Sequence, residues 1–230
     1  MFGFYGMNYG SNMILVLAAI AISMFAQSRV KSTFNKYSKV ISTSGYRGFE
    51  VARKILDRNG LYNIPIEMTP GKLSDHYDPT KKILRLSPEV YNGNSVASLG
   101  VAAHEVGHAI QDSKNYAPLT IRNTIAPAVA FSSKYVWGII FLGLIVGLTG
   151  FIKIGIAIYI GIVAFQLITL PVELDASKRA IDNLQNGILS PAEISPARSV
   201  LNAAAFTYIA ATLVSMAELF RLIGISNRRN

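Results

Sequence analysis

The sequence predicts an α-rich integral membrane protein in which about four transmembrane helices surround a small α+β region. Of its 230 residues, 51% are hydrophobic and only 15% are charged, whereas a soluble domain usually carries about 25% charged residues. Four stretches, each close to the length of a membrane span, contain no charged side chain. A more polar segment lies between the first two of them and includes a helical pattern with two histidines. These three observations exclude an ordinary soluble domain.

The four uncharged stretches predict the spans. Positive charge follows residues 1–28 rather than preceding them, so we expect a retained transmembrane helix and not a cleaved signal peptide. Residues 119–172 predict a transmembrane hairpin, because the stretches 135–152 and 154–172 are separated by Lys153 alone. Residues 199–230 predict a C-terminal transmembrane helix and tail.

The distribution of charge predicts the topology. The formal charge is +9, and thirteen of the 22 basic residues lie between Arg29 and Lys114, with none before the first span. The positive-inside rule then places the N-terminus outside and residues 29–118 in the cytoplasm. Contact with the lipid bilayer accounts for the rest of the positive charge. No basic stripe is interleaved with aromatic residues, so we expect no nucleic-acid partner.

Residues 29–118 are expected to form an α+β region. Residues 45–59 have helical spacing, residues 64–68 look extended, and residues 73–77 and 83–87 predict a hairpin around a turn at 78–82. The strand at 83–87 would either pair with an extended peptide as a sheet edge or lie inside the sheet. The sequence leaves both alternatives open.

A helix is predicted over residues 95–113. At 100° per residue, its apolar side chains gather on one face, while His104 and His108 lie about 40° apart on the opposite side. The apolar face consists of Leu99, Ala102, Ala103, Val106 and Ile110. The helix therefore has one apolar side for packing, and its opposite side carries the two histidines and is left for another role.

Residues 104–108 form an HExxH motif, which uses two of the only three histidines in the chain. Two imidazoles at i and i+4 suit two corners of a tetrahedral zinc site. Glu105 would act as general base toward a zinc-activated water and then pass the proton to the leaving amine. Cysteine is absent, which excludes a disulfide framework and cysteine-ligated metals.

A catalytic zinc normally takes three protein ligands and leaves one position open. The candidates for the third ligand are His76 and a downstream carboxylate. Residues 173–198 predict a helix that begins where the hairpin returns to the cytoplasmic side, with Pro171 able to open it. We expect Glu173 on this helix to be the ligand. Asp175 is the alternative, or a group that orients a ligand.

Five segments carry a resemblance that spans nearly the whole chain: residues 74–79, 84–87, 101–111, 116–119 and 171–177. In these segments the chain resembles the bacterial neutral zinc metallopeptidases of the YugP type, membrane relatives of the HtpX-like gluzincins. The resemblance implies a gluzincin-like catalytic region with one zinc per chain, held by His104, His108 and Glu173, with Glu105 as the catalytic base. Gluzincins often place an Asp four residues after the ligand Glu, where it orients a ligand imidazole. Here that position is Ser177 and the nearest Asp is Asp175, so the resemblance implies these two as the residues that orient ligands.

His76 has two interpretations. On a strand beside the HExxH helix it could stabilise the oxyanion of the reaction. It could instead be a structural histidine that holds the turn between Asp75 and Asp78.

The sequence therefore predicts a multi-pass zinc metallopeptidase of the bacterial plasma membrane, with its active site at the cytoplasmic face and a membrane-associated protein or peptide as substrate. Two alternatives remain at this point. One is a site-2-type intramembrane protease, which the polar residues on both sides of the motif disfavour. The other is a non-catalytic, zinc-stabilised membrane scaffold or adaptor, which has no need of Glu105.

Overall fold

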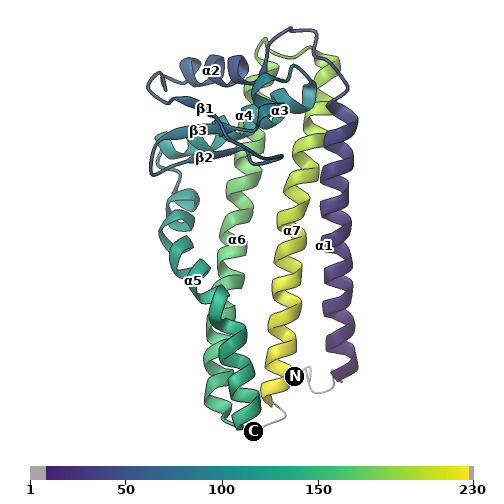
Figure 1. The fold of residues 1–230 in the computed structure, drawn as a ribbon, viewed down its shortest axis with the longest axis vertical. Helices are drawn as coiled ribbons and strands as arrows, with labels where there is room; N and C mark the ends of the chain where they lie inside the picture. Colours follow the sequence, from purple (N-terminus) through teal and green to yellow (C-terminus); the bar gives the residue numbers. More distant parts are fainter. Residues whose placement is uncertain (1–8, 228–230) are drawn as a thin grey trace, which may run out of the picture. The chain divides into compact units, whose positions relative to one another are not determined.

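The structure is a computed structural model that describes residues 9–227, so parts of the predicted segments 1–28 and 199–230 lie outside it. The described chain is mostly helical, with seven helices and one small mixed sheet of three strands, as the sequence predicted (Figure 1). In chain order the elements are α1 (Tyr9–Tyr37), α2 (Gly48–Arg58), β1 (Ile66–Met68), β2 (His76–Asp78), β3 (Ile83–Leu86), α3 (Pro88–Asn92), α4 (Val96–Ser113), α5 (Ala117–Val146), α6 (Thr149–Gln185) and α7 (Pro191–Asn227).

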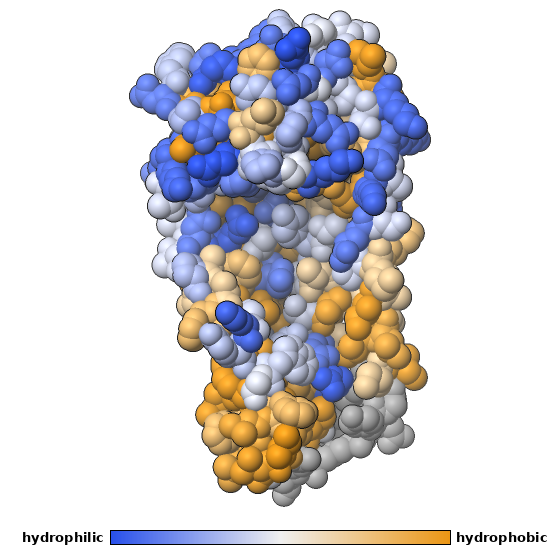
Figure 2. Space-filling model, in the orientation of Figure 1, coloured by the Kyte–Doolittle hydropathy of each residue, from blue (hydrophilic) through white to orange (hydrophobic). Residues whose placement is uncertain are grey.

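Helices α1, α5, α6 and α7 are long and apolar enough to cross a membrane. Many of their apolar side chains are exposed, and Figure 2 shows the resulting apolar surface over the hairpin of α5 and α6. A surface of this kind is stable in lipid and costly in water. The number of predicted spans is thus confirmed by length and composition.

The helical hairpin turns at a different place from the one that we predicted. Lys153 was expected to mark the link, but it lies exposed within α6, and the chain turns at Gly147, whose φ is +76°. Glycine adopts this left-handed conformation without steric cost and commonly ends helices. A long lysine side chain can instead reach the aqueous boundary from within a helix, and so it does not end one.

The chain forms two compact units. The first, here called the helical unit, contains residues up to Ala26, Ile121–Leu170 and residues from Thr207 onward. The second, here called the mixed unit, contains Gln27–Thr120 and Pro171–Phe206, and therefore the whole sheet and the HExxH helix.

Helix α6 contributes to both units as one continuous helix, and this differs from our prediction. Pro171 lies inside α6 and does not open a new segment there. A proline removes one backbone donor, which a long helix tolerates when its neighbours support it. The predicted helix 173–198 is instead the end of α6, a short link with Gly187 at φ +79°, and the start of α7.

The sheet of the mixed unit has the strand order β1-β3-β2. Strand β3 pairs in parallel with β1 and antiparallel with β2, in the register Tyr77 opposite Leu84. The predicted hairpin is confirmed, and Asp78 Oδ1 accepts hydrogen bonds from the backbone N–H groups of Thr80 and Lys81 in its turn. Strand β3 is the central strand, with both of its edges paired. It is therefore an internal strand and not a sheet edge that could pair with a peptide.

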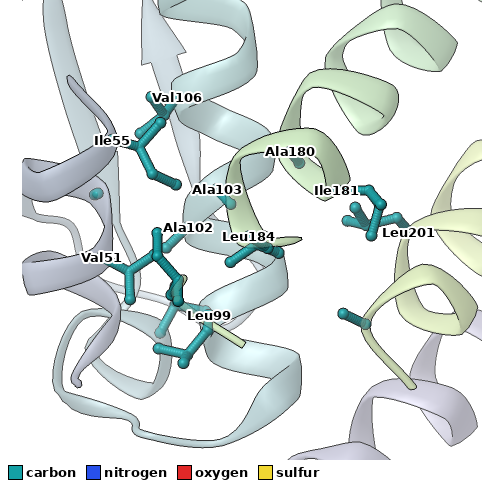
Figure 3. Packing of buried hydrophobic residues seen from close by; sticks show 14 of the residues in the cluster. Val51, Ile55, Leu99, Ala102, Ala103, Val106, Ala180, Ile181, Leu184 and Leu201 are labelled. Carbon is teal, nitrogen blue, oxygen red and sulfur yellow. The ribbon is translucent and has the colours of Figure 1, made fainter. Parts of the chain in front are cut away.

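The core of the mixed unit forms around α4, whose predicted apolar face is buried. Figure 3 shows this face meeting α2 on one side and the end of α6 on the other, with α7 beyond. Burying Leu99, Val106 and Ile110 stabilises the fold by roughly 1.5–3 kcal/mol each. The core therefore determines which side of α4 is left for the two histidines.

Candidate metal centre

Helix α4 presents the two histidines of the HExxH motif side by side. Its first turn is capped by Ser95, whose hydroxyl accepts a hydrogen bond from the Ser98 backbone N–H at 3.1 Å. The rings of His104 and His108 stand edge to face, with their centroids 4.8 Å apart. The helix therefore aims both imidazoles away from the core that its other face builds.

Glu173 reaches these histidines from α6. Its Oε2 lies 3.3 Å from His104 Nε2 and 3.6 Å from His108 Nε2. Ligands held at 2.0–2.2 Å around a tetrahedral zinc lie about 3.3–3.5 Å from one another. The donor atoms of the three residues all lie within 4.8 Å of one another. Two imidazoles and a buried carboxylate at this spacing suit zinc.

Close contact between two helix backbones makes this meeting possible. A Cβ atom on Gly107 would lie 2.6 Å from the Ala176 carbonyl oxygen, a distance that real side chains do not adopt. Glycine between the two histidines lets α6 approach α4 closely enough for Glu173 to reach both rings. The glycine of the motif is thus a packing requirement.

Hydrogen bonds engage Nδ1 of each imidazole, the ring nitrogen that does not face Glu173. Ser177 Oγ lies 3.2 Å from His104 Nδ1, and Gln111 Oε1 lies 3.0 Å from His108 Nδ1. When Gln111 accepts the Nδ1 proton of His108, the Nε2 lone pair is left for a metal. Both rings therefore turn Nε2 toward Glu173.

Gln111 is fully buried, and α6 holds its amide in turn. Its Nε2 donates to the Val172 carbonyl oxygen at 2.7 Å and to Asp175 Oδ2 at 2.9 Å. Asp175 also accepts from Arg179 Nε at 2.5 Å. Of the two residues predicted to orient ligands, Ser177 contacts a histidine directly, whereas Asp175 contacts the side chain that holds the other one.

Glu105 lies between the histidines in sequence and points toward strand β2. Its Oε2 accepts the backbone N–H of Tyr77 at 3.2 Å. The Tyr77 hydroxyl donates to Asp112 Oδ2 at 2.7 Å, which ties β2 to the end of α4. The strand therefore holds the carboxylate of Glu105 beside the metal-binding group.

The ionisable groups here have shifted pKa values. Burial lowers the pKa of His108, but its hydrogen bond to Glu173 and the negative charges of Glu105 and Glu173 outweigh this, so the net shift is upward. Burial raises the pKa of Asp75, and the charge of Glu105 adds to the increase. Burial and the hydrogen bond to Asp112 also raise the pKa of the Tyr77 hydroxyl. A bound cation would relieve this accumulation of negative charge.

His76 lies on β2 with its side chain exposed, outside the group formed by His104, His108 and Glu173. Its Nδ1 is 2.8 Å from the Ser74 carbonyl oxygen. Asp75 accepts from the Ser87 backbone N–H at 2.7 Å and thereby fixes the same loop. These contacts agree with the structural interpretation of His76, and no residue among 9–227 engages its Nε2, which leaves that nitrogen available for another role.

Sequence reasoning assigned no role to Gln111 or to the Tyr77 backbone. Gln111 could have been noticed, because it follows His108 by three residues and so shares its helix face. The N–H of Tyr77 carries no sequence signal, since every residue except proline has one. Only the approach of β2 to α4 reveals it.

Comparison with known proteins agrees with this geometry. The family described as "Putative neutral zinc metallopeptidase" matches residues 12–227. The protein named "Putative membrane protease YugP" from Bacillus subtilis (strain 168) is 48% identical over 213 residues, which cover 92% of this chain and 94% of that protein. No solved structure matches the chain. Both matches cover nearly the whole chain and include the HExxH helix and the His-His-Glu group. The chain therefore belongs to the neutral zinc metallopeptidase family.

Proposed function

We propose that the protein hydrolyses peptide bonds at one zinc ion held by His104, His108 and Glu173, with Glu105 as general base. One observation carries the proposal: the Glu173 carboxylate lies 3.3 and 3.6 Å from the Nε2 atoms of His104 and His108, and all three donor atoms lie within 4.8 Å of one another. Zinc bound there would supply a Lewis acid that acidifies water and polarises the scissile carbonyl.

In this mechanism Glu105 takes a proton from the attacking water and passes it to the leaving amine. The Tyr77 N–H holds one carboxylate oxygen. The structure records no partner for the other oxygen among the described residues, so that oxygen can accept the proton. Ser177 and Gln111 keep the imidazoles oriented, and Asp175 supports Gln111.

His76 is proposed to stabilise the developing oxyanion. Its imidazole is exposed on the strand whose next residue holds Glu105, and the Nδ1 contact with Ser74 orients the ring. The Tyr77 hydroxyl is a poorer candidate, because it is already engaged by Asp112.

The active site is proposed to lie at the cytoplasmic membrane face and to act on membrane-associated proteins. Thirteen of the 22 basic residues lie between Arg29 and Lys114, which also includes the HExxH helix. Among the described residues, α4 is not one of the helices apolar enough to span. This argues against the site-2-type alternative, in which the motif lies inside a span.

The proposal is tested with the full-length protein and a Glu105→Gln variant in detergent. Glutamine keeps the shape of the side chain but cannot take a proton, so zinc should stay bound at one ion per chain while hydrolysis of fluorescein-labelled casein falls by about 10²–10⁴-fold. Metal content by mass spectrometry and casein release are the two readouts.

Glu89→Gln serves as the matched control, because Glu89 is an exposed residue in the first turn of α3. It should retain both zinc and activity. Full activity of Glu105→Gln would refute the role of Glu105. Bound zinc without hydrolysis by the unaltered protein would favour the scaffold alternative.

A further inference from the structure

A small cavity of about 140 Å³ lies between the end of α6 and the start of α7, within the mixed unit. Leu174, Ile181, Leu201 and Ala205 supply its apolar lining. Ile181 and Leu201 face each other between the two helices in Figure 3. The polar lining consists of Ser177, Lys178, Asp182, Arg198 and Asn202.

The polar lining carries a net positive charge, with two cations against one carboxylate. Among the described residues, the structure records no ion pair and no hydrogen bond for the side chain of Lys178 or of Arg198. Both side chains are exposed, so each can turn toward an anion. Asn202 adds an exposed amide donor beside them. An apolar lining edged by unpaired cations is complementary to an amphiphile with an anionic head.

The cavity lies at one end of the uncharged run of each helix, after the run in α6 and before it in α7. Residues 154–172 of α6 carry no charge, and Lys178 is the first cation after them. On α7 the order is reversed, since Arg198 directly precedes the uncharged residues 199–217. Such boundaries mark the level at which hydrocarbon gives way to lipid headgroups. Both cations therefore belong to that level.

We propose that this cavity binds the phosphate group of an anionic membrane phospholipid, with Lys178 and Arg198 as its cationic partners. The volume equals that of about five water molecules, the scale of a phosphate group with its oxygens. Asp182 opposes the bound phosphate and limits its affinity. The proposal is independent of the catalytic role of the metal centre.

The test measures lipid binding to the full-length protein in detergent micelles by native mass spectrometry. The probes are dioleoyl phosphatidylglycerol, which is anionic, and dioleoyl phosphatidylcholine, which is not. Lys178→Gln and Arg198→Gln should each weaken the first phosphatidylglycerol association constant about fivefold, and together about thirtyfold. Asp182→Asn should strengthen it.

Lys72→Gln is the matched control, because Lys72 is an exposed lysine of the mixed unit that lies away from this cavity. It removes the same charge and should leave the association constant unchanged. Ser177 is left unaltered, since its hydroxyl also contacts His104. Thermal unfolding of each variant shows that the fold is retained.

Three results would overturn the proposal. The first is an equal loss of affinity in Lys72→Gln, which would indicate attraction by overall charge. The second is equal binding of the two lipids, unaffected by the substitutions. The third is binding of soluble glycerol 3-phosphate that depends on Lys178 and Arg198 while no lipid is retained, which would assign the cavity to a soluble phosphate.

Discussion

At the scale of single residues, the proposed ligands depend on side chains that do not contact the metal position. His108 is oriented by Gln111, whose amide is in turn held by the Val172 carbonyl and by Asp175. A buried amide with three partners has one stable orientation, because any flip would leave buried polar atoms without partners. Gln111 therefore acts as a positioning residue.

Replacing Gln111 with leucine should lower zinc affinity by about 10–100-fold, because the His108 ring loses the acceptor that selects its tautomer. The dissociation constant, measured with a competing zinc chelator, is the readout. Ser113→Ala on the same helix is the control, since within the described part of the chain the Ser113 hydroxyl bonds only the Ile110 carbonyl of its own turn. Equal zinc affinity in Gln111→Leu and the unaltered protein would contradict the positioning role.

The raised pKa of His108 also predicts how zinc binding depends on pH. Zinc binds the neutral imidazole, so a proton must leave first. In the metal-free site the neighbouring carboxylates hold that proton to a pH above the ordinary histidine value of about 6.5. As the solution is acidified, apparent zinc affinity should therefore begin to fall while the pH is still above this value. The fall should approach tenfold per pH unit, because one proton competes with zinc for His108. Chelator titrations between pH 8 and 5.5 would measure it, and a constant affinity down to pH 6 would contradict it.

At the scale of elements, the metal centre depends on how closely α4 and α6 approach. Two glycines of α4 allow a comparison. A Cβ on Gly107 would collide with the Ala176 carbonyl oxygen at 2.6 Å, whereas a Cβ on Gly100 would meet Ala197 at an ordinary 3.9 Å. The first contact is between backbones, which cannot move aside as a flexible side chain can.

Gly107→Ala should therefore push α6 away from α4, lower the free energy of unfolding by about 1–3 kcal/mol and weaken zinc binding. Gly100→Ala should be neutral or stabilising by up to about 1 kcal/mol, because alanine favours the helix. Denaturant unfolding and zinc titration of both variants give the comparison. Identical behaviour of the two variants would show that close backbone contact is not what brings Glu173 to the histidines.

At the scale of the whole molecule, the distribution of charge predicts the membrane topology. The chain has no cysteine, so single introduced cysteines report the side of the membrane without background. Lys72 is exposed in the loop between β1 and β2, and Leu148 is exposed in the link between α5 and α6. The positive-inside rule puts these two positions on opposite sides.

With intact cells and a membrane-impermeant maleimide, Leu148→Cys should be labelled, while Lys72→Cys should react only after the membrane is opened. Both positions lie away from the proposed ligands, so zinc content should remain unchanged. Measuring the zinc content of each variant therefore checks that it has folded correctly. Labelling of Lys72→Cys in intact cells would reverse the proposed topology and place the site outside.

Much of the molecule could be predicted from the sequence because the decisive signals are local. The apolar face of α4 and the pairing of His104 with His108 follow from helical periodicity alone, and the uncharged runs identify the four candidate spans. Turn residues at 78–82 likewise identified the hairpin. The ends of the helices were harder to predict from the sequence. Lys153 looked like a link and Pro171 like a start, yet both lie within α6, since neither residue must end a supported helix.

By itself, the sequence determined four candidate membrane spans, one HExxH helix and a short set of candidates for the third ligand. Only the tertiary structure decided how those candidates are arranged: Glu173 meets both histidines, His76 stays outside that group, and strand β3 is internal. The physical reason is distance along the chain. Glu173 lies more than sixty residues beyond His108, and helical periodicity cannot say which helices approach each other. In this chain the two helices come close enough for Gly107 to lie against the Ala176 carbonyl.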